Sequence, residues 1–232
     1  MAIPSFYHPT LHEHDSYVSL DQSEATHAVK ARRLKVGQEV RLFDGHGLVA
    51  HGTLSEVGRR SATVDVLTVK RVPRVEHGLT IAVPPPKGDR QKVMLDMLTQ
   101  LGVSGIVPLS CDYSVSKFSD TTQEKWRRVT IEAAKQSQNA FLPTIHDCVS
   151  IVELIEGTSK TVLVANADGQ SILNQPLVSS ERLILVGPEG GFSQAEFNFF
   201  KSMNISSIAL GGHILRTEAA AVAAAAQFNL MR

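Results

Sequence analysis

Two short segments in the last quarter of the chain place the tightest limits on its fold. Residues 183–191 read Leu-Ile-Leu-Val-Gly-Pro-Glu-Gly-Gly, and residues 210–218 read Leu-Gly-Gly-His-Ile-Leu-Arg-Thr-Glu. In each, an apolar run typical of a strand breaks into a glycine-containing loop and then a helix pattern. Ser193 and Glu196 have the spacing of a capping box at the start of the first helix. Open α/β sheets bind ligands beyond the carboxyl ends of their strands, so these loops predict one ligand crevice.

The residues of the two loops narrow the class of ligand. The chain has no G-x-x-x-x-G-K-[ST] pattern and no G-x-G-x-x-G after a strand, and Glu189 in the first loop would repel a phosphate. Glycines let main-chain atoms approach a ligand without an intervening Cβ. We therefore expect a neutral or cationic small molecule held by main-chain groups, with Arg216 and Glu218 at the mouth of the crevice. The alternative is that both segments are ordinary turns between a strand and a helix.

Length and composition set the class of protein. The chain has 232 residues, of which 43% are hydrophobic and 20% charged, which suits one large domain or two smaller ones. Its formal net charge is zero, so nucleic-acid binding would need local patches. Cys111 and Cys148 fit neither a disulfide framework nor a zinc ribbon and predict reduced thiols in a cytoplasmic protein. With no signal-peptide pattern and no apolar stretch of roughly 18–20 residues, we expect no membrane association.

The chain changes in character near residue 73. Before it, short alternating runs predict a small β-barrel with one helix over Ser23–Arg33, where Asp21 and Glu24 have capping-box spacing. The Asp44-Gly45 pair between two of the runs predicts a hairpin turn. The strands predicted in this part are Gln38–Phe43, Leu48–Glu56 and Ser61–Arg71.

After residue 73, strand and helix patterns alternate, which predicts an α/β domain with a mostly parallel sheet and helices on both faces. The predicted strands are Leu79–Val83, Gly105–Leu109, Thr161–Ala165, Leu183–Val186 and Ser206–Leu210. The predicted helices are Gly88–Leu101, Thr121–Ser137, Ser193–Met203 and Thr217–Met231. One face of the first of these helices carries Val93, Met94, Met97, Leu98 and Leu101. The last helix is rich in alanine, so it can lie close to another backbone, either inside the core or at a subunit interface.

The two glycine loops also resemble the signature segments of a known family. Gly187-Pro188-Glu189-Gly190-Gly191-Phe192-Ser193, and Leu210-Gly211 with Ile214-Leu215-Arg216-Thr217-Glu218, closely resemble those of the RsmE family. Members of this family are bacterial 16S ribosomal RNA (uracil-N3)-methyltransferases with the SPOUT fold. Further matches are Ile3-Pro4, Pro86-Lys87-Gly88-Asp89-Arg90, Leu101-Gly102-Val103 and Glu132-Ala133-Ala134-Lys135-Gln136-Ser137. The resemblance runs over nearly the whole chain in the family's order.

This resemblance implies an α/β protein with two domains. Residues 1–72 would form a PUA-like RNA-binding β-barrel, and residues 73–232 a SPOUT methyltransferase domain with a C-terminal trefoil knot. The protein would be a cytoplasmic homodimer that uses S-adenosyl-L-methionine and acts on 16S rRNA or the small ribosomal subunit during ribosome biogenesis. The residues expected to bind the cofactor are Val164, Ala165, Asn166, Gly187, Pro188, Glu189, Gly190, Gly191, Leu210, Gly211, Ile214, Leu215 and Arg216.

Three residues are candidates for the chemistry of this reaction. The N3–H of uracil is weakly acidic, and a cation near O4 or O2 would stabilise the developing anion. Arg216 is the candidate cation, because a guanidinium is always charged. Glu189 or Glu218 would accept a proton or orient the substrate. The alternatives are that Arg216 is a structural cap or an interface ion pair, and that the two carboxylates fix the loops.

Basic residues in the first part are candidates for RNA contacts. Four of them, Lys30, Arg32, Arg33 and Lys35, lie within six residues, and Arg59 and Arg60 could extend the cluster. On a PUA-like barrel these side chains would bind RNA phosphates, whereas most such clusters are simply solvated. His8, His12 and His14 have irregular spacing and no cysteine nearby, so we expect no metal site.

Several positions depart from the family's usual pattern, and they leave the target base open. Ser5 and the Asn139-Ala140 pair stand where arginines are usual, Asp96-Met97 replaces a Gln-Lys pair, and His213 ends a loop that usually reads Gly-Pro-Arg. One alternative is therefore a methyltransferase acting on a different RNA base, and another is a non-catalytic RNA-binding protein with a degenerate SPOUT domain. A nucleotide-dependent enzyme is a third, but its best support, Asp44-Gly45-His46-Gly47, is followed by a strand pattern and not a helix.

Overall fold

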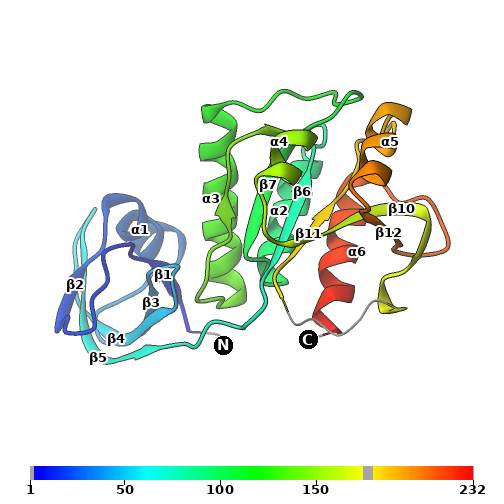
Figure 1. The fold of residues 1–232 in the computed structure, drawn as a ribbon. Helices are drawn as coiled ribbons and strands as arrows, with labels where there is room; N and C mark the ends of the chain where they lie inside the picture. Colours follow the sequence, from blue (N-terminus) through cyan, green and yellow to red (C-terminus); the bar gives the residue numbers. More distant parts are fainter. Residues whose placement is uncertain (1–2, 175–179, 232) are drawn as a thin grey trace. The chain divides into compact units, whose positions relative to one another are not determined.

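The computed structural model describes residues 3–174 and 180–231, which fall into two units. The first unit is Met1–Arg74 together with Ala134–Leu142, and the second is Val75–Ala133 together with Pro143–Arg232. Figure 1 shows the helices and strands of both. Each unit is described by itself below.

The first unit is built on a curled five-stranded sheet in the order β1-β3-β4-β5-β2. The strands are β1 (Ser5–Tyr7), β2 (Tyr17–Ser19), β3 (Glu39–Phe43), β4 (Leu48–Val57) and β5 (Ala62–Arg71). The predicted hairpin joins β3 to β4, and Asp44 Oδ1 accepts hydrogen bonds from the backbone N–H groups of His46 (2.6 Å) and Leu48 (2.9 Å). Gly45 and Gly47 both have positive φ in this turn. The Asp-Gly-His-Gly segment is therefore a β-turn and does not lead into a helix.

One helical segment covers this sheet, as the sequence predicted. It begins as α1 (Gln22–Thr26) and continues as a π-helical turn, η1 (His27–Ala31), so it ends two residues before the predicted Arg33. Asp21 accepts a hydrogen bond from the backbone N–H of Glu24 at 2.8 Å, as its capping position predicts. Arg33 itself has a φ of 52°, outside the helical range, which accounts for the earlier end.

A segment from the middle of the chain completes the first unit. Within residues 134–142, the backbone N–H of Leu142 donates to the carbonyl oxygen of Gly45 (2.9 Å), and Gly47 N–H donates to that of Ala140 (3.1 Å). Lys135 Nζ lies 2.9 Å from Glu24 Oε1, and the two side chains are 4% and 9% exposed. The first unit is therefore not one continuous stretch of chain.

The second unit contains a seven-stranded sheet. Its strands follow the order β12-β10-β11-β6-β7-β8, and β9 pairs with β7. Every pairing in this sheet is parallel, which confirms the predicted parallel sheet. The strands are β6 (Leu79–Val83), β7 (Gly105–Ser110), β8 (Thr144–Ile145), β9 (Val149–Ser150), β10 (Thr161–Ser171), β11 (Arg182–Leu185) and β12 (Ser206–Ala209).

Helices pack against both faces of this sheet. They are α2 (Arg90–Gln100), α3 (Asp120–Ser137), α4 (Ile151–Glu156), α5 (Gln194–Ser202) and α6 (Thr217–Asn229), and a short 3₁₀ turn, η2 (Ile172–Asn174), follows β10. Ile81 and Val83 share a buried cluster with side chains of α2, α3 and α6, whereas Ala82 between them packs in a cluster with α4 and α5. This packing on both faces explains why all five residues of the central strand β6 are buried.

The sequence predicted only part of the buried face of α2 correctly. Met94 and Leu98 are buried as predicted, and Leu95 is buried with them. Val93 and Met97 were expected on the same face, but they are 47% and 44% exposed. The short elements β1, β2, β8, β9 and α4 were not predicted, although Ser150 and Glu153 form a full capping box at the start of α4. The trefoil knot that the resemblance implies stays a prediction.

Candidate active site

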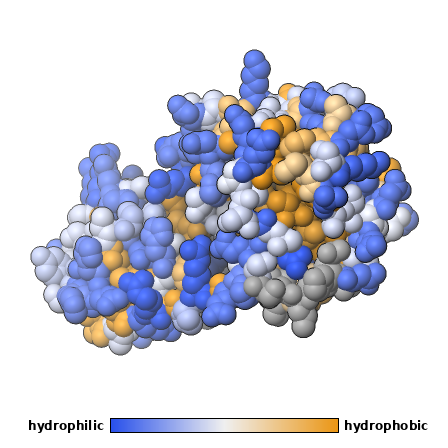
Figure 2. Space-filling model, viewed as in Figure 1, coloured by the Kyte–Doolittle hydropathy of each residue, from blue (hydrophilic) through white to orange (hydrophobic). Residues whose placement is uncertain are grey.

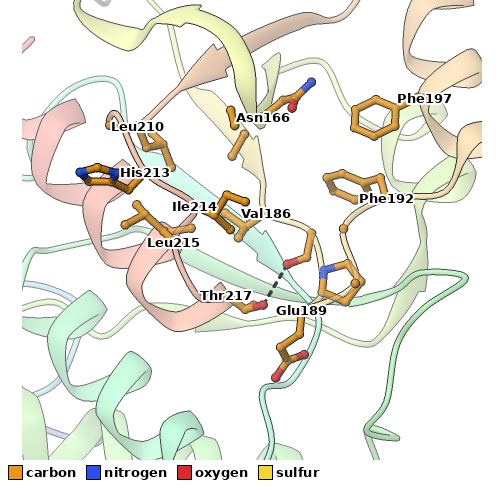
Figure 3. Close-up of a pocket in the computed structure, with 18 residues that line it drawn as sticks. Asn166, Val186, Glu189, Phe192, Phe197, Leu210, His213, Ile214, Leu215 and Thr217 are labelled. Carbon is orange, nitrogen blue, oxygen red and sulfur yellow. Dashed lines mark hydrogen bonds between the residues drawn. The ribbon is translucent and has the colours of Figure 1, made fainter.

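A pocket of about 370 Å³ lies where the parallel strands β11 and β12 end, beside residues 165–167 in the middle of β10 (Figure 3). This is the edge at which open α/β sheets hold ligands. The two glycine loops both line it, so the structure brings them together. Of the residues expected to bind a cofactor, those lining the pocket are Ala165, Asn166, Gly187, Pro188, Glu189, Gly190, Gly191, Leu210, Gly211, Ile214 and Leu215.

Two residues expected to bind the cofactor are not among those lining the pocket. Val164 is 0% exposed and packs in the buried cluster that also holds side chains of α4 and α5, so it presents no surface to the pocket. Arg216 is an exposed residue at the N-cap of α6, and its side chain makes no capping hydrogen bond. A cofactor contact stays a prediction for both residues.

Seven further residues line the pocket that sequence reasoning did not name as binding residues. They are Ala167, Val186, Phe192, Phe197, His213, Thr217 and Ala220. Phe192 and Thr217 belong to the signature segments quoted above, so a signal for them was present. Phe192 and Phe197 meet edge to face with their ring centroids 5.9 Å apart, and they close one side of the pocket (Figure 3).

Two side-chain hydrogen bonds hold the loops in place. Thr217 Oγ1 donates to the carbonyl oxygen of Gly187 at 3.1 Å, which ties the start of α6 to the first loop (Figure 3). Gln227, further along α6, donates from Nε2 to the carbonyl oxygen of Leu210 at 2.7 Å. Because both bonds come from α6, that helix positions both loops at once.

The first loop is shaped by its glycines and by the helix that follows. Gly191 has a φ of 74°, and its backbone N–H donates to the carbonyl oxygen of Pro188 at 2.9 Å. A β-carbon at Gly191 would have no heavy atom within 4 Å, so the requirement for glycine there comes from the backbone conformation. Ser193 and Glu196 form the predicted capping box, which fixes where α5 begins.

Charged groups gather beside the first loop. Arg90 Nη1, at the start of α2, lies 3.2 Å from Glu189 Oε1 and 3.9 Å from Glu218 Oε2. The Glu218 side chain is 14% exposed, and its Oε2 has no hydrogen-bond partner among the described residues. The two acidic candidates are therefore brought together, with Arg90 between them and not Arg216. Sequence reasoning gave Arg90 no role at this site.

The basic cluster predicted to bind RNA lies in the first unit. Its six members are all exposed: Lys30, Arg32, Arg33, Lys35, Arg59 and Arg60. Within the cluster, Arg32 donates from Nε to His27 Nε2 at 3.4 Å. No helix in the described part of the chain is both long and apolar enough to cross a membrane. Across residues 3–174 and 180–231, no three His, Cys, Asp or Glu side chains are grouped so as to hold a metal ion.

Comparison with known proteins finds family models that match most of the chain. A family model for an RNA methyltransferase domain matches residues 74–229, and one for an RNA methyltransferase PUA domain matches residues 20–67. Ribosomal RNA small subunit methyltransferase E of Rickettsia conorii is 33% identical over 224 residues, covering 94% of this chain and 91% of that protein. The Bacillus subtilis protein of the same name is 28% identical over 218 residues, covering 87% and 85%.

A solved structure agrees with the fold. Ribosomal RNA small subunit methyltransferase E from Neisseria gonorrhoeae, bound to S-adenosyl methionine, matches with a TM-score of 0.91 at 23% identity, covering 99% of this chain and 98% of that one. The residues matched by the family models, the identity to the Rickettsia protein and the shared fold lead to one conclusion: this chain belongs to the ribosomal RNA small subunit methyltransferase E family.

Proposed function

We propose that this protein transfers a methyl group from S-adenosylmethionine to N3 of a uridine in 16S rRNA. The observation that carries the proposal is the pocket formed by the two signature loops at the ends of β11 and β12, beside the middle of β10. The named relatives and the cofactor-bound Neisseria structure support it. The uridine N3 position follows from the family resemblance.

The pocket fits this cofactor in size and chemistry. Its volume of about 370 Å³ lies in the usual range for small-ligand sites. Val186, Leu210 and Ile214 supply apolar walls, and the loops offer main-chain N–H and carbonyl groups for the adenine and ribose. Glu189 on the rim suits a cationic sulfonium better than a phosphate. When bound, the cofactor supplies an electrophilic methyl group, and the protein's task is to orient the uracil toward it.

Arg216 is proposed to stabilise the uracil anion. It follows the second loop directly, and its exposed guanidinium makes no capping hydrogen bond to α6, so it is available to a substrate. Glu189 and Glu218 share the charge of Arg90, which favours a role in holding the site and orienting the base. Either carboxylate remains a candidate proton acceptor.

The first unit is proposed to bind the rRNA backbone. The PUA match over residues 20–67 contains all six basic residues of the predicted cluster, and all six are exposed. Phosphate contacts of this kind position an RNA without reading its sequence. Since the substrate is ribosomal RNA, we place the protein in the cytoplasm.

We further propose that the protein is a homodimer that pairs through α2 and α6. Figure 2 shows apolar surface gathered on the second unit, in the region where Figure 1 places α6. Val93 and Met97 on α2 are exposed one turn apart, and Leu230 at the end of α6 is 78% exposed. The substitution Met97→Glu should shift sedimentation toward the monomer mass. The control Val152→Glu, on the opposite face of the sheet and 44% exposed in the wild-type chain, should leave the dimer intact.

The test of the proposed reaction is direct. Purified protein is incubated with isotope-labelled S-adenosylmethionine and small ribosomal subunits from a strain that lacks this enzyme, and the rRNA nucleosides are analysed by mass spectrometry. Labelled 3-methyluridine supports the proposal. A labelled nucleoside of another kind would place the methyl group on a different base. Cofactor and rRNA binding without transfer would identify an RNA-binding protein with an inactive second domain.

A further inference from the structure

The loop that follows β7, residues 111–119, reaches the first signature loop. A β-carbon built on Gly190 would lie 3.4 Å from Cβ and 3.5 Å from Cδ2 of Tyr113, so the tyrosine packs against the glycine backbone. Gly190 lines the cofactor pocket. Tyr113 therefore stands at the rim of that pocket, although β6 separates β7 from β11 in the sheet.

Hydrogen bonds fix the backbone on both sides of Tyr113. Ser193 Oγ donates to Asp112 Oδ2 at 2.5 Å, and the backbone N–H of Asp112 donates to Glu196 Oε1 at 2.9 Å. Ser114 Oγ accepts from the backbone N–H of Cys111 at 2.8 Å. The capping box of α5 thus holds the loop, and the tyrosine is presented from a rigid support.

The side chains of this loop alternate between exposed and half-buried. Tyr113 and Val115 are each 53% exposed, Lys117 is exposed, and the serines between them are half-buried. A single exposed apolar side chain needs no explanation. Here an aromatic ring, an aliphatic side chain and a cation point outward at alternate positions beside a cofactor pocket. Aromatic rings interleaved with cations are the pattern of single-stranded nucleic-acid platforms.

We propose that Tyr113 is the platform on which the target uracil stacks when it is turned out of the RNA, with Lys117 near an adjacent phosphate. The inference rests on the proposed function, since it assigns a binding residue for the same reaction. A base that is methylated at a ring nitrogen must leave its stack and its pairing partner to expose that edge. Stacking on one face of the ring would hold the uracil while leaving its N3 edge free.

Substitution tests the ring separately from its hydroxyl. Tyr113→Ala should raise the RNA concentration that gives half-maximal single-turnover methylation by about 5- to 150-fold, the usual range for one base–aromatic stack. Tyr113→Phe should stay within about 2-fold of wild type, because stacking uses the ring face. Affinity for S-adenosylmethionine, measured by calorimetry, should be unchanged in both. Tyr17→Ala, an exposed tyrosine on β2 of the first unit, is the matched control and should behave as wild type.

A photochemical experiment gives a readout that does not depend on methylation. A substrate RNA fragment with 5-iodouridine at the target position should crosslink to Tyr113 on irradiation, and mass spectrometry of the peptides identifies the attached residue. The crosslink should be lost in Tyr113→Ala and kept in the Tyr17→Ala control. Wild-type methylation with no crosslink at Tyr113, or with normal kinetics in Tyr113→Ala, would overturn this inference alone. A wild-type protein that methylates no uridine would instead overturn the proposed function.

Discussion

The guanidinium of Arg90 pairs with the carboxylate of Glu189, with Nη1 3.2 Å from Oε1. The same Nη1 lies 3.9 Å from Glu218 Oε2, so one cation from the start of α2 faces carboxylates from the first signature loop and from α6. Without it, the two neighbouring carboxylates would repel each other. Arg90 therefore helps to set the distance between two walls of the pocket.

Replacing Arg90 should loosen the pocket that is proposed to bind the cofactor. Arg90→Ala is expected to weaken S-adenosylmethionine binding by about 2- to 5-fold, a modest effect because the Arg90 and Glu189 side chains are 34% and 32% exposed. In the double variant with Glu189→Ala the two losses should not add, since each removes the same contact. Arg128→Ala breaks an exposed pair with Glu124 on α3 and is the control. If calorimetry shows that the two losses of S-adenosylmethionine affinity add fully in the double variant, the proposed coupling between Arg90 and Glu189 is wrong.

Arg216→Ala should slow methyl transfer without loss of cofactor binding. Removing one donor that stabilises a developing anion costs about 100- to 1,000-fold in rate. Arg216→Lys should recover only part of that rate, because an ammonium lacks the planar fork of the guanidinium. The measurement is single-turnover transfer at saturating RNA and cofactor. A rate near wild type for Arg216→Ala would exclude the Arg216 side chain from the chemical step.

Replacing Arg32 and Arg33 together by alanine should weaken RNA binding and lower its dependence on salt. Each phosphate contact that is lost removes about one unit from the slope of log affinity against log salt. Affinity for S-adenosylmethionine should not change. A paired control, Lys125→Ala with Arg127→Ala, removes two exposed cations of α3 outside the predicted cluster. If both double variants lose RNA affinity equally, the effect of Arg32 and Arg33 is a non-specific effect of charge.

The Lys135–Glu24 pair should matter far more to stability than a surface pair. Lys135→Ala is expected to lower the free energy of unfolding by about 3–5 kcal/mol, because it removes one partner of a buried ion pair. The double substitution Lys135→Met with Glu24→Leu, which replaces both charges by apolar side chains, should recover most of that loss. Arg71 pairs with Glu13 at the surface, and their side chains are 58% and 56% exposed. Arg71→Ala should therefore lower the free energy of unfolding by less than about 1 kcal/mol. Urea unfolding measures all three variants.

The two cysteines should differ in reactivity and in pH dependence. Burial, with a smaller contribution from the charge of Glu196, raises the pKa of the Cys111 thiol to about 12. Native protein treated with iodoacetamide at pH 8 should be modified at the exposed Cys148 and spared at Cys111. The folded state holds the Cys111 proton more tightly than the unfolded chain does. The contribution of this thiol to the free energy of unfolding therefore falls as pH rises above about 8.5. Cys111→Ala should remove that part of the pH dependence in urea titrations.

Most of the second unit could be predicted because its signals are local. Buried parallel strands are continuous apolar runs, and glycines and a capping box mark the turns at their ends. Ser193 and Glu196 could be placed from their spacing alone, and the structure confirms them. The short strands β8 and β9 are two residues each, too brief for any periodicity to be detected.

Contacts between distant parts of the chain left no such signal. Lys135 is 111 residues from Glu24, and nothing in its neighbourhood marks it as part of the first unit. The sequence showed Arg90 as a match to the family, but its pairing with Glu189 depends on how the start of α2 and the loop after β11 come together in the fold. Val164 was assigned by its place at the end of a strand, and the side of the sheet it faces depends on register.

The insertion of residues 134–142 into the first unit also sets the order in which this protein can be completed during synthesis. A chain emerging amino end first would present all five strands of the curled sheet long before Ala140 and Leu142 arrive to pair with Gly47 and Gly45. Until then the Lys135 ammonium, which lies beside Glu24 in the finished fold, has not been synthesised. Nascent chains of intermediate length should therefore remain sensitive to protease in their first unit, although all of its strands have been translated.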